Sequence, residues 1–340
     1  MSREFNIAVA GATGAVGVEM LKVLEARKFP VKNIRLLASA RSVGKRMTFR
    51  GEECAVEELR HDSFTDIDIA LFSAGASISR EFRKSVVEAG ALMVDNSSAF
   101  RMEDDVPLVI PEVNPEDVGR HAGVIANPNC STIIMLTAVA PLHRAKTLRR
   151  VVAATYQAAS GAGAKAMEEL VVQARHVLDG VPVAPQAFAH RIAFNLIPHI
   201  DAFLDSGYTK EEMKMQNESR KMLHHPSLMI STTCVRVPVL RAHSEALNLE
   251  FETPVTPEEA RKILATAPGV VLVDDPATKR YPMPMDASGK DEILVGRIRQ
   301  DCSRTDGKGL DIFVSGDQIL KGAALNAVQI AELAVQRMKK

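Results

Sequence analysis

Residues 6–17 read NIAVAGATGAVG, and this stretch decides the fold of the amino-terminal part of the chain. A short apolar strand runs directly into Gly11, Gly14 and Gly17, and a helical pattern of apolar residues follows over 15–27. Small residues at such a turn let backbone N–H groups approach a pyrophosphate at the helix N-terminus. The stretch therefore predicts a dinucleotide site. The spacing is GxxGxxG instead of GxGxxG, and tight strand–helix packing without a ligand remains an alternative.

Strand and helix patterns alternate through the first 130 residues. Further short apolar strands are expected at 34–38, 69–73, 92–95 and 124–126, with a helix at 79–89. Alternation of this kind indicates a parallel sheet with helices on its faces. We therefore expect an α/β protein whose amino-terminal domain is Rossmann-like and doubly wound.

From about residue 150 the pattern changes to longer strands and separate helices, which is typical of an α+β domain. Strands are expected at 151–155, 234–240, 246–251, 293–299 and 310–314, and helices at 165–178, 210–223 and 257–267. A last helix is expected over 318–338, packed back on the first domain. The predicted domains are 1–130 with 318–340, and 131–317.

Composition narrows the class of protein. The 340 residues hold 42 basic and 42 acidic side chains, so no global charge favours nucleic acid or an anionic membrane. No apolar run reaches the ~18 residues of a membrane span, and the N-terminus resembles neither a signal nor a transit peptide. We expect a cytoplasmic protein. The four cysteines are widely scattered, so neither disulfides nor a metal site is expected.

The end of the second expected strand bears on the choice of cofactor. Residues 37–46 read LASARSVGKR and contain no acid to bind a ribose 2′-OH. Ser39, Arg41 and Ser42 offer hydroxyls and a cation, which suit a 2′-phosphate and favour NADP. A solvated basic loop is the alternative. Ser73, Ala74 and Gly75 follow a strand end and are also assigned to the cofactor site, although a plain loop explains them equally well.

Cys130 lies in the segment ANPNCSTIIML, at the expected first turn of an apolar helix. Free N–H groups and the helix dipole favour a thiolate there. Cys54, Cys234 and Cys302 lie in strand-like or loop stretches, where buried inert thiols are the default. From these residues alone, an inert packed thiol at position 130 is an equal alternative.

Twelve segments, taken together and in order, resemble the aspartate-β-semialdehyde dehydrogenase family in its shorter bacterial form. They are GATGAVG, LASARSVGK, DIALFSAG, VDNSSAFRM, VPLVIPEVN, NPNCST, TYQAASGAG, IAFNLIPHIDAF, EEMK, CVRVPVLRAHSEA, VGRIRQD and GDQILKGAA. The resemblance implies NADPH-dependent reductive dephosphorylation of 4-phospho-L-aspartate to L-aspartate 4-semialdehyde, on the route to lysine, threonine and methionine. It also implies a homodimer whose interface is formed by the second domain.

The resemblance also implies a role for each matching side chain. Cys130 would form the thioester, Gln157 would orient the acyl group, and His243 would serve as acid and base, taking the thiol proton. The expected substrate ligands are Arg236 for the α-carboxylate, Glu211 for the α-ammonium group, and Arg101 and Lys214 for phosphate. The expected cofactor ligands are Gly11, Thr13, Gly14, Ala15 and Val16 at the pyrophosphate, Arg41 and Ser42 at the 2′-phosphate, and Ser160, Gly161 and Gln318 around the nicotinamide.

Two pairs of these residues have a plainer explanation. Glu211 and Lys214 are three apart on one expected helix, as in an ordinary surface ion pair. Arg236 and His243 are seven apart, which would put them on opposite faces of one regular strand. Pro238 lies between them and cannot donate to a sheet ladder, so the sequence predicts a break or bulge that realigns both side chains.

Two other functions stay open at this point. An N-acetyl-glutamyl-phosphate reductase would use the same chemistry on a longer, acylated substrate. Glu211 argues against it, because a carboxylate is useful against a free ammonium group and not against an acetamide. A catalytically silent paralogue that only binds ligands is the second alternative, although retention of both Cys130 and His243 disfavours it.

Overall fold

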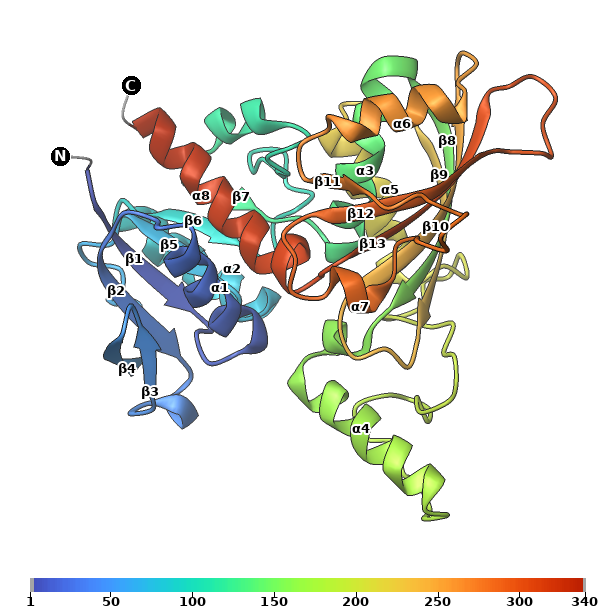
Figure 1. Cartoon of the computed structure of the whole chain (residues 1–340). Helices are drawn as coiled ribbons and strands as arrows, with labels where there is room; N and C mark the ends of the chain where they lie inside the picture. Colours follow the sequence, from blue (N-terminus) through green and yellow to red (C-terminus); the bar gives the residue numbers. More distant parts are fainter. Residues whose placement is uncertain (1–2, 339–340) are drawn as a thin grey trace. The chain divides into compact units, whose positions relative to one another are not determined.

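The structure is a computed structural model that describes residues 3–338 (Figure 1). The chain divides into two compact units, one holding Met1–Pro128 and Ala323–Lys340, the other Asn129–Gly322. The division falls a few residues from the expected boundaries at 130 and 318, so Cys130 and Gln318 both lie in the second unit. The reason is local, because Asn129 caps the helix that begins at Cys130, and Gln318 is bonded to Ser160 and Ala242 of the second unit.

The first unit is built on a seven-stranded sheet in the order β3-β4-β2-β1-β5-β6-β7. All neighbouring strands are parallel except the β3–β4 pair. The strands are β1 (Phe5–Ala10), β2 (Val31–Ala38), β3 (Arg46–Phe49), β4 (Glu52–Glu58), β5 (Ile69–Phe72), β6 (Leu92–Asp95) and β7 (Val124–Ala126). This order confirms the doubly wound α/β class. The β3–β4 hairpin was not predicted, because its strands are charged and largely exposed.

Three long helices belong to this sheet: α1 (Ala15–Ala26), α2 (Ala76–Glu88) and α8 (Leu325–Met338). α1 and α8 lie side by side (Figure 1), and α8 also packs on β5 and β6. The short helices are η1 (Ala40–Ser42) and η2 (Pro115–Arg120).

The single helix expected over 318–338 is wrong at its start. A π-helical turn, η4 (Leu320–Ala324), precedes α8, and the Asp317 carboxylate accepts from the N–H groups of Ile319 and Leu320 at its start.

The second unit is built on a six-stranded mixed sheet in the order β11-β12-β13-β10-β8-β9. Its strands are β8 (Leu148–Gln157), β9 (Met229–Arg236), β10 (His243–Phe251), β11 (Val270–Leu272), β12 (Ile293–Gln300) and β13 (Gly309–Gly316). The strand expected over 234–240 is wrong at its end, because β9 stops at Arg236. The break predicted near Pro238 is confirmed: residues 237–242 form a loop, and Ala242 has a φ of 72°.

Three helices pack on one face of the second sheet: α3 (Cys130–Lys146), α5 (Lys210–Met222) and α6 (Pro257–Ala265). α3 is buried on almost every side, which explains its continuous apolar sequence. The remaining helices of this unit are η3 (Ala159–Ala162), α4 (Ala164–Leu178) and α7 (Pro284–Ala287). α4 follows η3 and extends away from the sheet (Figure 1). Within residues 3–338 we find no helix that is long and apolar enough to cross a membrane.

Candidate active site

Cys130 is the first residue of α3, as the sequence predicts. Asn129 caps the helix: its Oδ1 accepts from the N–H groups of Ser131 at 3.0 Å and Thr132 at 3.2 Å. Two carboxylates of α5 hold the cap in turn. The Asn129 backbone N–H donates to Glu218 at 2.7 Å, and its Nδ2 donates to Glu211 at 2.9 Å. The helix start that presents the thiol is therefore fixed by a buried network.

Gln157, Arg236 and His243 lie in one row at the end of the second sheet. β8 runs between β9 and β10, with Gln157 paired to Arg236 on one side and Tyr156 paired to Ser244 on the other. His243 is therefore the cross-strand neighbour of Gln157 on the same face. The chain brings Arg236 and His243 together by placing them on different strands with β8 between them. All three side chains are buried.

Ala158, just beyond β8, is bonded to both outer members of this row. Its N–H donates to Nδ1 of His243 at 3.0 Å, and its carbonyl accepts from Nη1 of Arg236 at 2.7 Å. An imidazole nitrogen that accepts a hydrogen bond carries no proton, so the proton of the neutral ring is on Nε2. Burial first and the Arg236 charge second hold the pKa of His243 well below its ordinary value.

Cys130 interacts electrostatically with Arg236, so the thiol lies near the row of Gln157, Arg236 and His243. Burial lowers the pKa of Arg236, and the nearby negative charges of Cys130 and Glu211 oppose that shift. Gly161 also packs here. A Cβ at position 161 would lie 2.8 Å from Nη1 of Arg236 and 3.0 Å from Nε2 of His243, which is too close for an unshifted structure. Glycine at 161 therefore lets η3 approach both side chains.

Glu211 and Lys214 form an ion pair on α5, with an Oε2 to Nζ distance of 3.1 Å. The pair is not an exposed one, because Glu211 is buried and accepts from Asn129 and, at 3.4 Å, from Gln157. Lys214 also donates to Asp201 at 2.7 Å. Burial acts to lower the pKa of Lys214, but the two carboxylates outweigh it and the pKa is raised. Thr209 and Glu212 form the capping box of α5, so Glu212 is structural.

Gln318 connects two loops of the second unit. Its Oε1 accepts from the Ala242 N–H at 2.9 Å, and its Nε2 donates to the Ser160 hydroxyl. Asp317, the preceding residue, is fully buried and bonded to Arg241 at 2.6 Å and to the Gly289 N–H at 2.7 Å. Both residues therefore fix the loop that leads into His243. In this structure the polar atoms of Gln318 contact protein groups.

The glycine turn of the first unit leaves no room for side chains. A Cβ on Gly11 would lie 2.3 Å from the Ser73 carbonyl oxygen, and one on Gly17 would lie 2.3 Å from the Gly11 carbonyl oxygen. Gly14 occupies the N-cap position of α1 and has no side chain to bond the first N–H groups of Ala15 and its successors. Donors at a helix start without a side-chain cap fit a pyrophosphate.

Other expected cofactor residues gather at the same end of the first sheet. Ser39 and Arg41 are exposed at η1, just after β2, and the Ser42 hydroxyl lies 3.4 Å from the Thr13 hydroxyl. Residues 73–75 follow β5 and lie against the Gly11 turn, where Gly75, with a φ of 92°, is the N-cap of α2. The chain thus brings the Ser42 and Thr13 hydroxyls and residues 73–74 together at the glycine turn.

Arg101 is buried in the first unit, at the carboxyl ends of β6 and β7. Its Nε donates to the Asn127 carbonyl and its Nη2 to the Asn96 carbonyl, both at 3.0 Å. Nδ2 of Asn127 donates to Oδ1 of Asn96 at 2.5 Å, and Nδ2 of Asn326 on α8 donates to Oδ1 of Asn127 at 2.7 Å. The orientation of the guanidinium is therefore set by a buried amide network that sequence patterns did not indicate.

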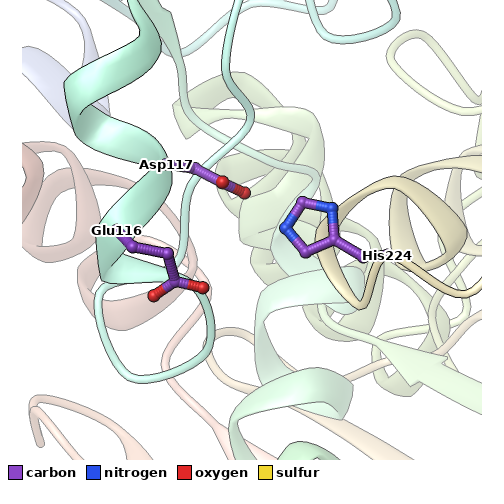
Figure 2. Close-up of side chains that lie close together, drawn as sticks. All are labelled: Glu116, Asp117 and His224. Carbon is purple, nitrogen blue, oxygen red and sulfur yellow. The ribbon is translucent and has the colours of Figure 1, made fainter.

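Two acidic residues that the sequence analysis did not assign to a site, Glu116 and Asp117, lie on η2. Figure 2 shows the side chains of Glu116 and Asp117, two successive residues of η2, and that of His224, which follows α5. Asp117 is buried, accepts from Asn114 at 2.8 Å and pairs with Arg120 at 3.0 Å. These bonds shape the η2 turn of the first unit.

Sequence reasoning missed two buried residues, one next to Cys130 in the chain and one next to His243 on β10. Asn129 carries a signal that was available, because asparagine before a helix is a common N-cap. Glu245 lies two residues after His243 on β10, so the period of a strand puts both on one face. Its carboxyl group is fully buried, and among the described residues neither oxygen has a hydrogen-bond partner. Burial raises the pKa of Glu245 well above its ordinary value.

A glycine turn of the dinucleotide-binding kind, together with a helix-start cysteine near a buried arginine, fits a dehydrogenase. Family models agree: residues 6–121 match the semialdehyde dehydrogenase NAD binding domain, and 139–321 match the semialdehyde dehydrogenase dimerisation domain. Aspartate-semialdehyde dehydrogenase of Prochlorococcus marinus is 53% identical over 98% of this chain and 97% of that protein. The chain belongs to the aspartate-semialdehyde dehydrogenase family.

Solved structures agree with this membership. Aspartate-semialdehyde dehydrogenase II from Vibrio cholerae, crystallised in complex with ASA, has a TM-score of 0.96 and 45% identity, and the match covers 98% of this chain and 99% of that one. The enzyme from Candida albicans with NADP has a TM-score of 0.75 and 25% identity, again over 98% and 99% of the two chains.

Proposed function

We propose that the protein is an NADP-dependent oxidoreductase that converts 4-phospho-L-aspartate and NADPH into L-aspartate 4-semialdehyde, NADP and phosphate. One observation carries the proposal: the thiol at the start of α3 is coupled to a buried row of Gln157, Arg236 and His243. Such a row suits a covalent acyl intermediate, because a thiolate attacks carbon while fixed donors bind the oxyanion.

The side chains of the second unit divide the work on the substrate. Cys130 attacks the acyl carbon and phosphate leaves, which gives a thioester. Arg236 binds the α-carboxylate, since its guanidinium is buried and held in place by Ala158. Glu211 receives the α-ammonium group, and Gln157, bonded to Glu211 and Thr155, orients the acyl oxygen. Lys214 binds the phosphate group, and so does Arg101 of the first unit.

The first unit binds the cofactor, which supplies a hydride when bound. Thr13, Ala15 and Val16 line the pyrophosphate turn with the neighbouring glycines, and residues 73–75 line its side. Arg41 and Ser42 bind the 2′-phosphate, which supports NADP over NAD. The Candida albicans relative with NADP supports the same choice. Three residues of the second unit, Ser160, Gly161 and Gln318, position the nicotinamide side.

The proposal predicts a phosphate-dependent reaction that can be followed at the nicotinamide absorbance. Purified protein should reduce NADP in the presence of aspartate semialdehyde and phosphate, and oxidise NADPH with 4-phospho-L-aspartate. Cys130→Ser should lower kcat by roughly three orders of magnitude or more. Cys302→Ser, at an exposed cysteine, is the matched control and should leave kcat unchanged. A preference for N-acetyl-glutamyl phosphate would overturn the assignment of substrate.

We further propose that the protein is a homodimer whose interface lies on the open face of the second sheet. α3, α5 and α6 cover one face, while the other exposes Tyr156, whose ring lies 6.1 Å from that of Phe313. The match to a dimerisation domain over 139–321 supports a second copy there. Tyr156→Glu should shift the mass measured by light scattering toward one chain. Val43→Glu, at an exposed apolar residue of the first unit, is the control.

A further inference from the structure

We propose that Asp201 determines the anion specificity of the phosphate site, because its carboxylate admits phosphate and opposes sulfate. The inference rests on the proposed function, since it starts from Lys214 as a phosphate ligand, and it deepens that function by naming a specificity residue. No sequence pattern pointed to Asp201. It lies in the loop that precedes α5, the helix that carries Lys214.

The Lys214 ammonium group is shared by two carboxylates. Its Nζ lies 2.7 Å from Oδ2 of Asp201 and 3.1 Å from Oε2 of Glu211. An ammonium group has three N–H donors, so within residues 3–338 one donor of Lys214 is left for an anion. An anion that binds there lies next to a carboxylate that is bonded to the same nitrogen. The site therefore attracts an anion and restricts which anion it accepts.

Of the two carboxylates, that of Asp201 is the one open to a small anion. Its side chain is 36% exposed, compared with 8% for Glu211, which also accepts from Asn129 at 2.9 Å. Burial acts to raise the pKa of Asp201, but the bonds from Lys214 and the Ala202 N–H outweigh it and the pKa is lowered. Asp201 therefore presents a negative charge at neutral pH.

The loop fixes the Asp201 carboxylate in this position. Asp201 has a left-handed φ of 68°, a conformation that aspartate and asparagine tolerate better than most residues. Its Oδ1 accepts from the Ala202 N–H at 2.8 Å, and the Ala202 carbonyl accepts from the N–H of Lys210 at 2.9 Å. The rings of His199 and Phe203, on either side of Asp201 in the chain, stack with their centroids 4.5 Å apart. A carboxylate held in this way does not swing aside when an anion arrives.

The proton on phosphate decides whether this carboxylate helps or hinders binding. HPO₄²⁻ and SO₄²⁻ have the same charge and nearly the same shape, but only phosphate keeps a proton near pH 7. The P–OH group can donate to Asp201 while another phosphate oxygen accepts from Lys214, and hydrogen bonds to a charged acceptor are short and strong. Sulfate offers only acceptor oxygens, so it meets a like charge with no hydrogen bond. Asp201 therefore suits the inorganic phosphate of the proposed reaction and disfavours sulfate.

Asp201→Asn tests the proposal with little change to the loop. Asparagine tolerates the same φ and can still accept from the Ala202 N–H, but its amide group turns a donor toward the anion. We expect the Kd of sulfate to fall by roughly tenfold or more, while the Kd of phosphate changes by less than about threefold. Asp205→Asn removes another exposed aspartate of the same loop and is the matched control, with the wild-type ratio of the two constants.

Isothermal titration calorimetry of the full chain with inorganic phosphate and with sulfate gives both dissociation constants without turnover. Inhibition of the phosphate-dependent reduction of NADP by sulfate gives the same comparison during turnover. If Asp201 only holds Lys214 in place, Asp201→Asn should weaken both anions by the same factor. An unchanged ratio of the two constants would therefore overturn the proposal, and so would a wild-type protein with no preference for phosphate.

These measurements separate the inference from the proposed function. An inactive wild-type protein that prefers phosphate, and loses the preference in Asp201→Asn, would refute only the proposed function. An active enzyme whose ratio is the same in wild type and Asp201→Asn would refute this inference alone.

Discussion

Arg236 and His243 are bonded to opposite ends of the same residue, Ala158, at 2.7 Å and 3.0 Å. Any shift of the chain at the end of β8 therefore moves both side chains together. The neighbouring turn, η3, begins at Ala159 and brings Gly161 against both side chains. Steric changes in η3 should consequently affect substrate binding and chemistry at the same time.

Gly161→Ala tests this coupling. Its new Cβ would come within 2.8 Å of Arg236 and 3.0 Å of His243, so one of them must move by several tenths of an ångström. Small displacements of reacting groups are costly, and we expect kcat/KM to fall by roughly 10- to 100-fold with little change in Tm. Ala162→Ser, at the exposed neighbour in η3, should behave as wild type. Wild-type activity of Gly161→Ala would show that the ring and guanidinium are not held as tightly as the structure indicates.

Cofactor choice can be tested at η1, where Arg41 stands beside Ser42. If Arg41 binds the 2′-phosphate, Arg41→Ala should raise the KM for NADPH by roughly tenfold, the effect of losing about 1.4 kcal/mol, and leave the KM for NADH unchanged. Lys45→Ala removes another exposed cation of the same basic loop and is the control. Equal effects of the two substitutions would favour a solvated loop with no specific contact.

Much of the fold was predictable because it depends on patterns within short segments. The glycine turn at Gly11–Gly17 and the alternation of strands and helices led directly to the doubly wound sheet. The hairpin of β3 and β4 was not predictable in this way, because its strands carry charged, exposed residues instead of an apolar face. The π-helical turn before α8 was also missed, since its start depends on Asp317 side-chain bonds that periodicity does not record.

Local sequence patterns likewise predicted some features of the candidate site and not others. Pro238 was enough to predict a break between Arg236 and His243, but no local pattern could say that β8 would lie between their strands. Pairings of distant segments decide such neighbours. The bonds from Asn129 to Glu211 and Glu218, and from Asn326 to Asn127, join residues more than 80 positions apart. Patterns within one segment carry no information about partners this far apart in the chain.

The proposed phosphate ligand of the first unit gives a third prediction. The guanidinium of Arg101 uses two nitrogens to hold the carbonyls of Asn96 and Asn127. A lysine cannot make two directed bonds of this kind and still present its charge, so Arg101→Lys should raise the KM for phosphate by roughly tenfold or more and lower kcat less. Arg80→Lys is the control, because Arg80 also donates to a backbone carbonyl of this unit, that of Ala99. A fall in kcat that exceeds the rise in KM would indicate that Arg101 acts in the chemical step instead.

The buried carboxyl group of Glu245 gives a prediction about pH and stability. Burial raises its folded-state pKa well above the ordinary 4.5, so the folded protein holds a proton that the unfolded chain releases. The stability that Glu245 contributes is therefore present below about pH 4.5 and is lost as pH rises through the folded-state pKa.

Glu245→Gln replaces this group with a neutral side chain of nearly the same shape and should abolish that loss. Relative to wild type, the variant should gain unfolding free energy as pH rises from 5 to 9, by at most about 1.4 kcal/mol per pH unit. Urea midpoints measured at each pH for both proteins give the difference directly. A pH-independent difference for Glu245→Gln would mean that Glu245 has the same pKa in the folded and unfolded chain, and that an ionised carboxylate lies on the same face of β10 as His243.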